Sequence, residues 1–322
     1  MSTSESSERV VLVRQARWAA EGVLELQLAD PAGASLPLWE PGAHLDLVLP
    51  SGLRRSYSLC GDPADRDVWT IAVRREPDGR GGSREVHDTG LVGRTLTAHG
   101  PVNRFPLVDA PGHLLLAGGI GVTPLLAMAR ALQRAGRPWR MVYAARDRQS
   151  FAYADELTRL GGEDQVRLVP EHKQGRPDLA AELAAVPAGH AVYCCGPEGM
   201  IEAITRLCAD SVPPRDLHVE RFAAASEPSD VPADGFEVYL RSSDLRLRVP
   251  ADRSLLDVVR DHLPGVPYSC EEGYCGTCET PVLAGLPDHR DTVIDPSERE
   301  TATTMMICVS RAAASAVLEL DL

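Results

Sequence analysis

The sequence contains no apolar run approaching the ~20 residues that a bilayer-spanning helix needs. Its start, MSTSESSERV, lacks the basic and then apolar pattern of an export signal. It also lacks an excess of positive charge, because 46 acidic and 33 basic side chains give a net charge of −13. Such a chain repels phosphate backbones. We therefore expect a cytoplasmic protein with neither nucleic acid nor a membrane as partner.

No internal repeat or low-complexity tract is present, and the hydrophobic share of 44% is that of an ordinary globular protein. A length of 322 residues allows two or three domains. Four of the eight cysteines fall in the last 53 residues. Because disulfides are disfavoured in a reducing compartment, this clustering indicates metal or redox chemistry.

Residues 1–108 lack long helical periodicity. Short apolar runs at 10–13, 23–28, 44–49, 56–59, 68–73 and 94–98 are separated by Gly, Pro and Asp. This pattern predicts an antiparallel β-barrel or β-sandwich.

Residues 109–224 alternate between apolar strand-like runs and amphipathic segments of helical length. The predicted strands are 113–117, 140–144, 165–169, 191–195 and 217–219, and the predicted helices are 124–133, 153–160, 179–185 and 198–208. The alternation predicts an α/β domain with a parallel sheet covered on both faces. Residues 225–235 read as a linker.

Residues 236–322 predict a small α+β domain. Runs at 236–240 and 245–249 indicate a hairpin, and further strands are expected near 282, 305–309 and 316–320. Ser254 and Asp257 have the spacing of a capping box, which predicts a helix from 254 to 263.

The most specific motif is a group of cysteines with the spacing C-x4-C-x2-C and a fourth cysteine after 29 intervening residues. These cysteines are Cys270, Cys275, Cys278 and Cys308. The spacing is that of plant-type [2Fe–2S] ferredoxins. Gly273 and Gly276 would let the backbone pass close to the sulfides. A structural zinc site is the alternative, although zinc sites usually pair two CxxC motifs. No histidine lies in the loop, which excludes a Rieske centre.

Two glycine-containing turns follow predicted strands of the α/β domain. The first, GGIGVTP at 118–124, precedes a helix and predicts an anion site at the helix N-terminus. Pro124 stands where a dinucleotide fingerprint would have its third glycine, and a tight connection is the alternative. The second, Cys195-Gly196-Pro197, ends a later strand. Because ligands bind at the carboxyl ends of parallel strands, the two turns predict one crevice.

Two motifs in the β part suit a phosphate beside a flat ring. Arg55-Ser56-Tyr57-Ser58 combines a bidentate phosphate donor with an aromatic face, although it could be an ordinary surface strand. The loop GRGGS at 79–83 offers backbone N–H groups, a hydroxyl and a cation.

Taken in order, RSYS, GRGGS, GGIGVTP, CGP and CEEGYCGTC resemble the phthalate dioxygenase reductase family, whose relatives include the vanillate O-demethylase reductases. The resemblance covers essentially the whole chain. It implies an FMN-binding β-barrel, an NAD-binding α/β domain and a β-grasp-like ferredoxin domain.

The resemblance also implies roles for particular residues, and no catalytic acid or base. The flavin would lie along Arg55, Ser56, Tyr57, Ser58, the main chain of Ala72, Val73 and Arg74, and Phe222. Gly81, Gly82 and Ser83 would hold the FMN phosphate. The nicotinamide nucleotide would contact Gly119, Gly121, Thr123, Pro124, Cys195, Gly196 and Pro197. The four motif cysteines would hold the [2Fe–2S] cluster.

The cofactor set makes chemical sense as a relay. A nicotinamide delivers two electrons as a hydride, a cluster takes one at a time, and a flavin handles both. The segment Arg146-Asp147-Arg148 does not decide between NADH and NADPH, because an acid favours NADH and an arginine accommodates the 2′-phosphate of NADPH. The resemblance favours NADH.

By resemblance, the electron acceptor is a separate Rieske-type aromatic oxygenase or demethylase, with a cytochrome P450 as the alternative, and the chain is a monomer. Residues 236–322 carry 15 acids and 8 bases, which fits either a soluble surface or an acidic docking face. Two other functions stay open: a flavin oxidoreductase or oxidase with a structural metal, and a non-enzymatic redox carrier.

Overall fold

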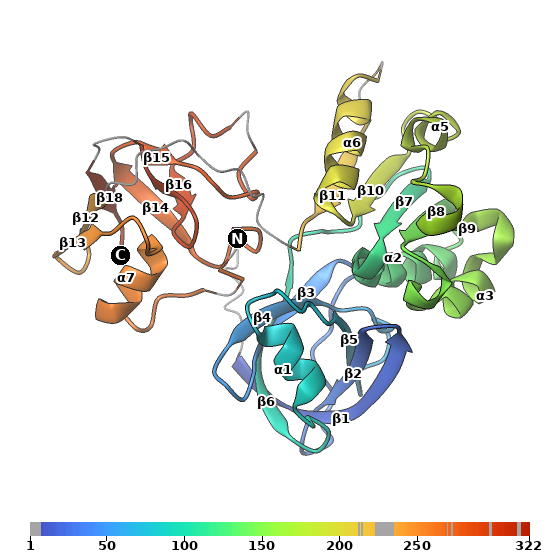
Figure 1. Ribbon diagram of the computed structural model, residues 1–322, viewed down its shortest axis with the longest axis horizontal. Coiled ribbons are helices and arrows are strands. Elements are labelled where there is room, and N and C mark those ends of the chain that lie inside the picture. The colour runs from blue at the N-terminus through green and yellow to red at the C-terminus, as the bar shows by residue number, and fades with distance from the viewer. Residues whose placement is uncertain are drawn as a thin grey trace. The chain divides into compact units, whose positions relative to one another are not determined.

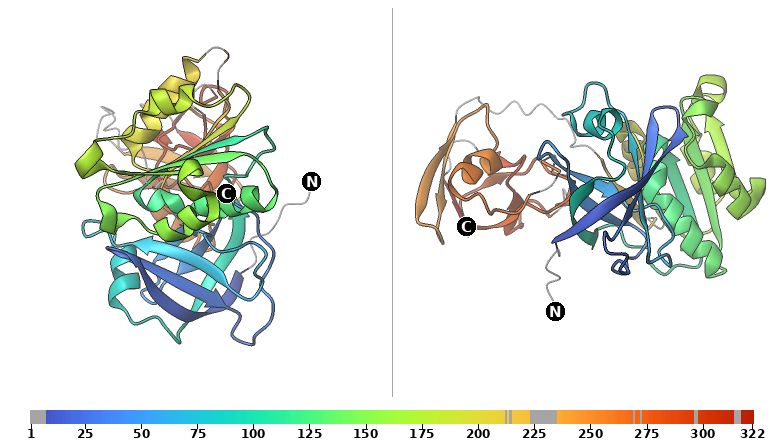
Figure 2. Two further views of the ribbon diagram at one scale, coloured as in Figure 1. Left: turned by 90° about the vertical axis from the view of Figure 1, so that its right-hand side faces the viewer. Right: turned by 90° about the horizontal axis from the view of Figure 1, so that it is seen from below.

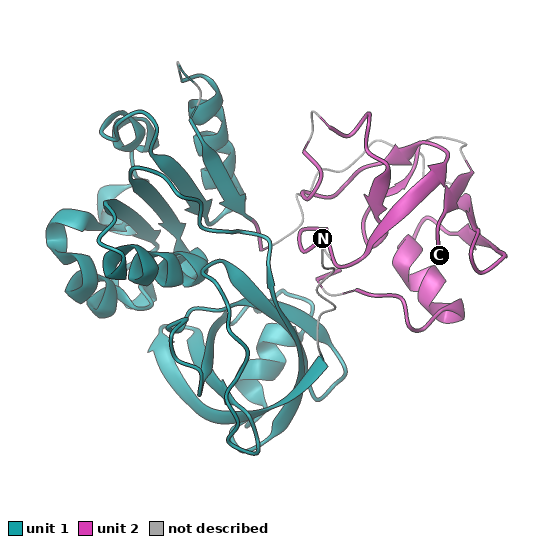
Figure 3. Cartoon of the chain, turned by 180° about the vertical axis from the view of Figure 1, so that it is seen from behind, with its two compact units in different colours: residues 1–220 teal, residues 221–322 magenta. Residues whose placement is uncertain are grey.

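The computed structural model describes residues 8–211, 213, 215–222, 235–268, 270–271, 273–295, 298–313 and 317–322. The chain forms two compact units, residues 1–220 and 221–322 (Figure 3). Nearly all of the predicted linker lies outside the described residues, and the domain boundaries stay predictions. No helix in the described part of the chain is both long and apolar enough to cross a membrane.

The first unit begins with a six-stranded antiparallel sheet, as predicted (Figure 1). Its strands are β1 (Glu8–Ala20), β2 (Val23–Ala29), β3 (Ala43–Val48), β4 (Arg54–Ser58), β5 (Trp69–Arg74) and β6 (Thr95–Asn103). They are ordered β4-β3-β6-β1-β2-β5. A bridge between Leu59, directly after β4, and Ile71 within β5 joins the two edge strands, so that the sheet curls into a barrel.

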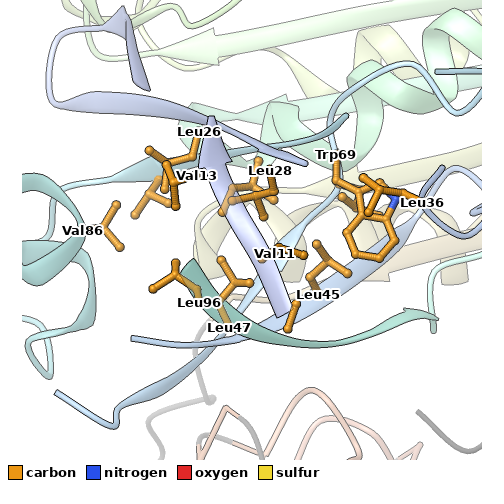
Figure 4. Packing of buried hydrophobic residues seen from close by; sticks show 14 of the residues in the cluster. Val11, Val13, Leu26, Leu28, Leu36, Leu45, Leu47, Trp69, Val86 and Leu96 are labelled. Atoms are coloured by element: carbon orange, nitrogen blue, oxygen red, sulfur yellow. The ribbon is translucent and has the colours of Figure 1, made fainter. Parts of the chain in front are cut away.

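Alternate side chains of these strands fill the barrel. Val11 and Val13 of β1 lie among Leu26 and Leu28 of β2 and the inward residues of β3 (Figure 4). Burial of one such side chain stabilises the fold by about 1.5–3 kcal/mol. The sequence did not predict the short helix α1 (Gly82–Asp88), which adds Val86 to this core.

The parallel sheet of the first unit contains β7 (His113–Gly118), β8 (Trp139–Ala145), β9 (Val166–Pro170), β10 (Ala191–Cys195) and β11 (Leu217–Glu220). Helices α2 (Val122–Arg134) and α3 (Ala154–Gln165) cover one face, and α5 (Leu179–Ala184) and α6 (Glu198–Ala209) cover the other (Figures 1 and 2). The predicted glycine turn contains a short 3-10 helix, η1 (Gly119–Gly121). The 3-10 helix η2 (Arg148–Ser150) and the short α4 (Glu171–Gln174) were not predicted.

The strand order β11-β10-β7-β8-β9 has a functional consequence. After β7 the chain proceeds to β8 on one side, and after β10 it proceeds to β11 on the other. The point where the order reverses therefore lies between β7 and β10. Open α/β sheets bind ligands at such a point.

The second unit packs one main helix on a mixed sheet, which fits the predicted α+β domain. Its sheet runs β13-β12-β18-β14-β16, with β12 and β18 parallel. The bounds are β12 (Phe236–Leu240), β13 (Leu245–Val249), α7 (Leu255–His262), β14 (Glu279–Ala284), β16 (Thr304–Met306) and β18 (Leu318–Leu320), with β15 (Pro287–Asp288) and β17 (Arg311–Ala312) as a separate pair. The predicted capping box is confirmed, because Asp257 donates its N–H to Ser254 Oγ at 3.0 Å.

Candidate functional site

The two glycine turns of the parallel sheet touch each other at the reversal point. A Cβ atom at Gly121 would lie 2.2 Å from the carbonyl oxygen of Cys195. A Cβ at Gly118 would lie 2.4 Å from Cδ of Pro197, and one at Gly196 would lie 3.0 Å from Gly118 Cα. Only glycine permits this approach of backbone to backbone. The structure therefore brings the GGIGVTP and CGP motifs together, as the sequence analysis expected.

The helix that follows the first turn begins without an acidic side chain in its first turn. Its free N–H groups and its dipole therefore favour an anion such as a pyrophosphate. Thr123 is buried and donates its hydroxyl to the carbonyl of Ile120 at 3.0 Å, which holds the turn in shape. Pro124 is tolerated because a first-turn residue needs no N–H donor.

The flavin motif of β4 lies against the glycine loop that precedes α1. Arg55 donates through Nη2 to the carbonyl of Arg80 at 3.1 Å, and a Cβ at Gly82 would lie 2.7 Å from Arg55 Cγ. Gly81 takes the left-handed conformation at the start of α1, with φ 91°. Ser83 accepts a hydrogen bond from the Glu76 N–H at 3.0 Å. A guanidinium beside a helix N-terminus fits a phosphate group.

Other residues of the flavin motifs have different neighbours. Ser56 donates its hydroxyl to Asp46 at 2.6 Å, so this side chain is engaged within the barrel. Tyr57 is half-buried against the barrel core, and burial raises the pKa of its hydroxyl. The Val73 carbonyl contacts His87 Nε2 at 2.9 Å. Phe222 belongs to the second unit, and its role at the flavin stays a prediction.

Ser58, Cys195 and Glu220 meet where the antiparallel and parallel sheets adjoin. Ser58 Oγ donates to Glu220 at 3.3 Å, and Glu220 is the register partner of Cys195. Desolvation raises the pKa of the Glu220 carboxyl to about 8, although the Ser58 hydrogen bond opposes this shift. Burial and the nearby Glu220 raise the pKa of the Cys195 thiol. Glu220 is not among the predicted site residues, and its only sequence signal is its place at the end of the last parallel strand.

Arg74 links the two sheets at a second point. A Cβ at Gly119 would lie 3.5 Å from the guanidinium of Arg74, so this side chain reaches from β5 to the first glycine turn. Arg74 also pairs with Glu76. The predicted flavin strand therefore borders the predicted nucleotide turn.

Asp147 follows β8 and shapes the turn η2. Its Oδ1 accepts hydrogen bonds from the N–H groups of Gln149 and Ser150, both at 3.1 Å, and from the Ser150 hydroxyl. These hydrogen bonds lower the pKa of the Asp147 carboxyl, and the bond from the Ser150 side chain has the largest effect. Asp147 thus orders the loop at this end of the sheet, while Arg146 and Arg148 are exposed.

The four motif cysteines are gathered in the interior of the second unit, each at most 6% exposed. The pairing of Glu279 in β14 with Met306 in β16 brings Cys278 beside Cys308. The Cys275 thiol lies beside that of Cys270. Cys308 also contacts Cys270, so the four thiols are mutual neighbours, and four thiolates are the number of ligands that two irons require.

The charge balance of these thiols also fits a metal cluster. The hydrogen bond with the Cys270 thiol raises the pKa of Cys275 most, burial raises it further, and repulsion between neighbouring buried thiolates adds to both effects. Cationic irons would remove this penalty. Thr277 directs its N–H to Cys275 Sγ at 3.5 Å, which fits a hydrogen bond to a ligating sulfur. Gly273, with φ 72°, leaves no room for a Cβ beside Val309.

Fold and site together define a reductase that takes electrons from a nicotinamide nucleotide and passes them through a flavin to an iron–sulfur centre. Residues 238–313 match the 2Fe-2S iron-sulfur cluster binding domain family, and residues 105–212 match the N-terminal domain of dimethylamine monooxygenase subunit DmmA-like proteins. The chain is 44% identical over 308 residues to a phenoxybenzoate dioxygenase subunit beta of Ectopseudomonas oleovorans, covering 95% of this chain and 94% of that protein. It is 41% identical over 310 residues to the phthalate dioxygenase reductase of Burkholderia cepacia, covering 94% of each.

Solved structures agree with these relatives. A phthalate dioxygenase reductase, described as modular for electron transfer from pyridine nucleotides to [2Fe–2S], superposes with a TM-score of 0.78 at 37% identity over 98% of both chains. An intact type IV self-sufficient cytochrome P450 monooxygenase matches with a TM-score of 0.84 and 40% identity, over 98% of this chain and 41% of its own. The chain belongs to the phthalate dioxygenase reductase family. It is an NAD(P)H-dependent iron–sulfur flavoprotein oxidoreductase of the kind that supplies oxygenases.

Proposed function

We propose that this chain passes electrons from NADH through FMN to a [2Fe–2S] cluster held by Cys270, Cys275, Cys278 and Cys308, and then to a terminal oxygenase. The gathering of these four cysteines in the buried interior of the second unit carries the proposal, because four neighbouring thiols fit a diiron centre. The nucleotide crevice of the first unit supplies the other end of the relay.

The chain's own residues bind and orient the cofactors. Arg55, Gly82 and Ser83 would hold the FMN phosphate, since a guanidinium and free N–H groups meet there. The glycine turns after β7 and β10 would hold the NADH pyrophosphate and lead the nicotinamide toward β4. When bound, the flavin accepts the hydride pair and releases its electrons singly.

Ser58, Cys195 and Glu220 would surround the place where nicotinamide and flavin meet. Below about pH 8 the Glu220 carboxyl is neutral, so it adds no negative charge beside a flavin that gains electrons. The Ser58 hydroxyl keeps this carboxyl in position. Cys195 is buried, so its side chain would help to keep water away from the place where the nicotinamide and the flavin meet.

The acceptor we propose is a Rieske-type oxygenase, since the phthalate and phenoxybenzoate relatives are dioxygenase components that match along nearly their whole length. A cytochrome P450 is the second candidate, because the self-sufficient P450 contains a segment like this chain. We further propose that the protein is a cytoplasmic monomer and that NADH is preferred to NADPH.

An absorption spectrum with iron, sulfide and flavin assays tests the relay. Flavin and cluster bands that NADH bleaches under anaerobic conditions are the expected result. Zinc with flavin would instead establish an oxidoreductase with a structural metal. Bands that NADH cannot bleach would establish a redox carrier.

A further inference from the structure

A buried carboxylate lies directly behind the cysteine loop. The Asp291 side chain has no exposed surface, and its Cα would lie 3.1 Å from a Cβ placed on Gly273, between Cys270 and Cys275 in the loop. The neighbouring Thr292 donates its N–H to the Gly273 carbonyl at 2.9 Å. The segment that follows β15 therefore packs against the loop that carries three of the cysteines.

The same carboxylate also contacts the segment that carries the fourth cysteine. Ser310, two residues after Cys308, donates its hydroxyl to Asp291 Oδ2 at 3.1 Å. The other oxygen, Oδ1, accepts the N–H groups of Val293 at 3.1 Å and Ile294 at 2.9 Å. Three hydrogen-bond donors therefore surround this buried side chain and occupy both of its oxygens.

Positive charge near this carboxylate is limited among the described residues. His289 Nδ1 lies 3.7 Å from Oδ2, and Arg299 directs its guanidinium to the Asp291 main-chain carbonyl at 2.6 Å rather than to the carboxylate. A buried charge acts more strongly on its surroundings than an exposed one, because little water screens it. A negative charge beside a cluster disfavours the added electron and lowers the reduction potential.

We propose that Asp291 is a positioning residue for the cluster, which fastens the Cys308 segment to the three-cysteine loop and lowers the cluster's reduction potential through its charge. The proposal rests on the cluster ligands proposed above. Asp288 provides a matched control: it is the last residue of β15, three positions before Asp291, and is partly exposed and paired with Arg290 at 2.7 Å.

The experiment is a redox titration of the cluster in the full-length protein, after iron and sulfide assays. Asp291→Asn keeps the size of the side chain and an oxygen for the two N–H donors but removes the charge. We expect its one-electron reduction equilibrium to shift at least tenfold toward the reduced cluster, which is a rise of about 59 mV. Asp288→Asn should leave the potential unchanged. Ser310→Ala removes a donor from the carboxylate and should shift the potential in the opposite direction.

The outcomes separate the two proposals. A potential in Asp291→Asn equal to that of Asp288→Asn overturns the role of Asp291 and leaves the relay intact. If Asp291→Asn retains no cluster while Asp288→Asn is fully loaded, the result supports the claim that Asp291 fastens the Cys308 segment to the three-cysteine loop. The potential of Ser310→Ala then tests the claim that the charge of Asp291 lowers the reduction potential. An unchanged or raised potential in Ser310→Ala then overturns the proposal. Absence of iron and sulfide from the wild-type protein would contradict the proposed function instead.

Discussion

Ser58 of β4 donates a hydrogen bond of 3.3 Å to Glu220 of β11, across 162 residues of sequence. This contact joins the antiparallel sheet to the parallel sheet beside the glycine crevice. It places a carboxyl with a pKa of about 8 at the predicted meeting point of flavin and nicotinamide.

The first prediction concerns pH. Because the folded pKa of Glu220 is raised, the carboxyl is neutral at pH 7 and gains its charge as the pH rises through about 8. The rate of flavin reduction by NADH should then fall about threefold to tenfold, equivalent to about 0.7–1.4 kcal/mol. Stopped-flow measurement from pH 6.5 to 9.5 should show this fall in the wild type and a flat profile in Glu220→Gln. The exposed Glu202→Gln on α6 is the control, and an identical fall in Glu220→Gln would contradict the assignment.

The crevice makes a steric prediction. In Gly121→Ala the new methyl group would collide with the carbonyl of Cys195, so the two turns must separate. We expect the Kd for NADH to rise more than tenfold, which is about 1.4 kcal/mol or more. Gly90→Ala, whose Cβ would enter open space, should bind NADH normally. Titration calorimetry or flavin fluorescence measures both, and unchanged binding in Gly121→Ala would place the nucleotide elsewhere.

Arg55 should matter for retention of FMN. A hydrogen bond to a charged group contributes about 1.5–3 kcal/mol, so Arg55→Ala should weaken FMN binding by roughly 10- to 150-fold. The control is Arg14→Ala, which removes an exposed arginine of β1. Equilibrium dialysis of the apoprotein with FMN gives the two constants. Equal affinities in the two variants would exclude Arg55 from the phosphate site.

The relay order predicts a split between two activities. Cys275→Ser should abolish reduction of one-electron protein acceptors, such as cytochrome c, while NADH still reduces the flavin at the wild-type rate. Cys208→Ser changes a buried thiol on α6 and should retain both activities. If Cys275→Ser also retains both, electrons leave the flavin without passing through the cluster.

Salt dependence tests the proposed acidic docking face. Residues 236–322 have a net charge of −7, and exposed charges are screened over about 8 Å at physiological ionic strength. Turnover with the native oxygenase should therefore decline as the sodium chloride concentration rises from about 20 to about 300 mM. Reduction of the flavin by NADH should change little over the same range. Salt-independent turnover would remove acidic docking and leave the relay unaffected.

The sequence by itself determined the elements and the class of cofactors. Cys270, Cys275 and Cys278 are close in the chain, and glycine turns directly follow apolar strands, so each ligand set is largely local. Short-range periodicity likewise predicted the strands of both large sheets. It missed α1 because seven residues are too few for a clear helical period.

Only the tertiary structure decided which distant residues complete these local sets. Glu220 meets Ser58 because the end of β11 lies against β4 of the other sheet, and Asp291 meets Ser310 because β15 pairs with β17, beside which these two residues lie. An acidic residue carries no sequence pattern that marks it as buried. Burial and partner choice arise from packing between segments far apart in the chain, which local periodicity does not encode.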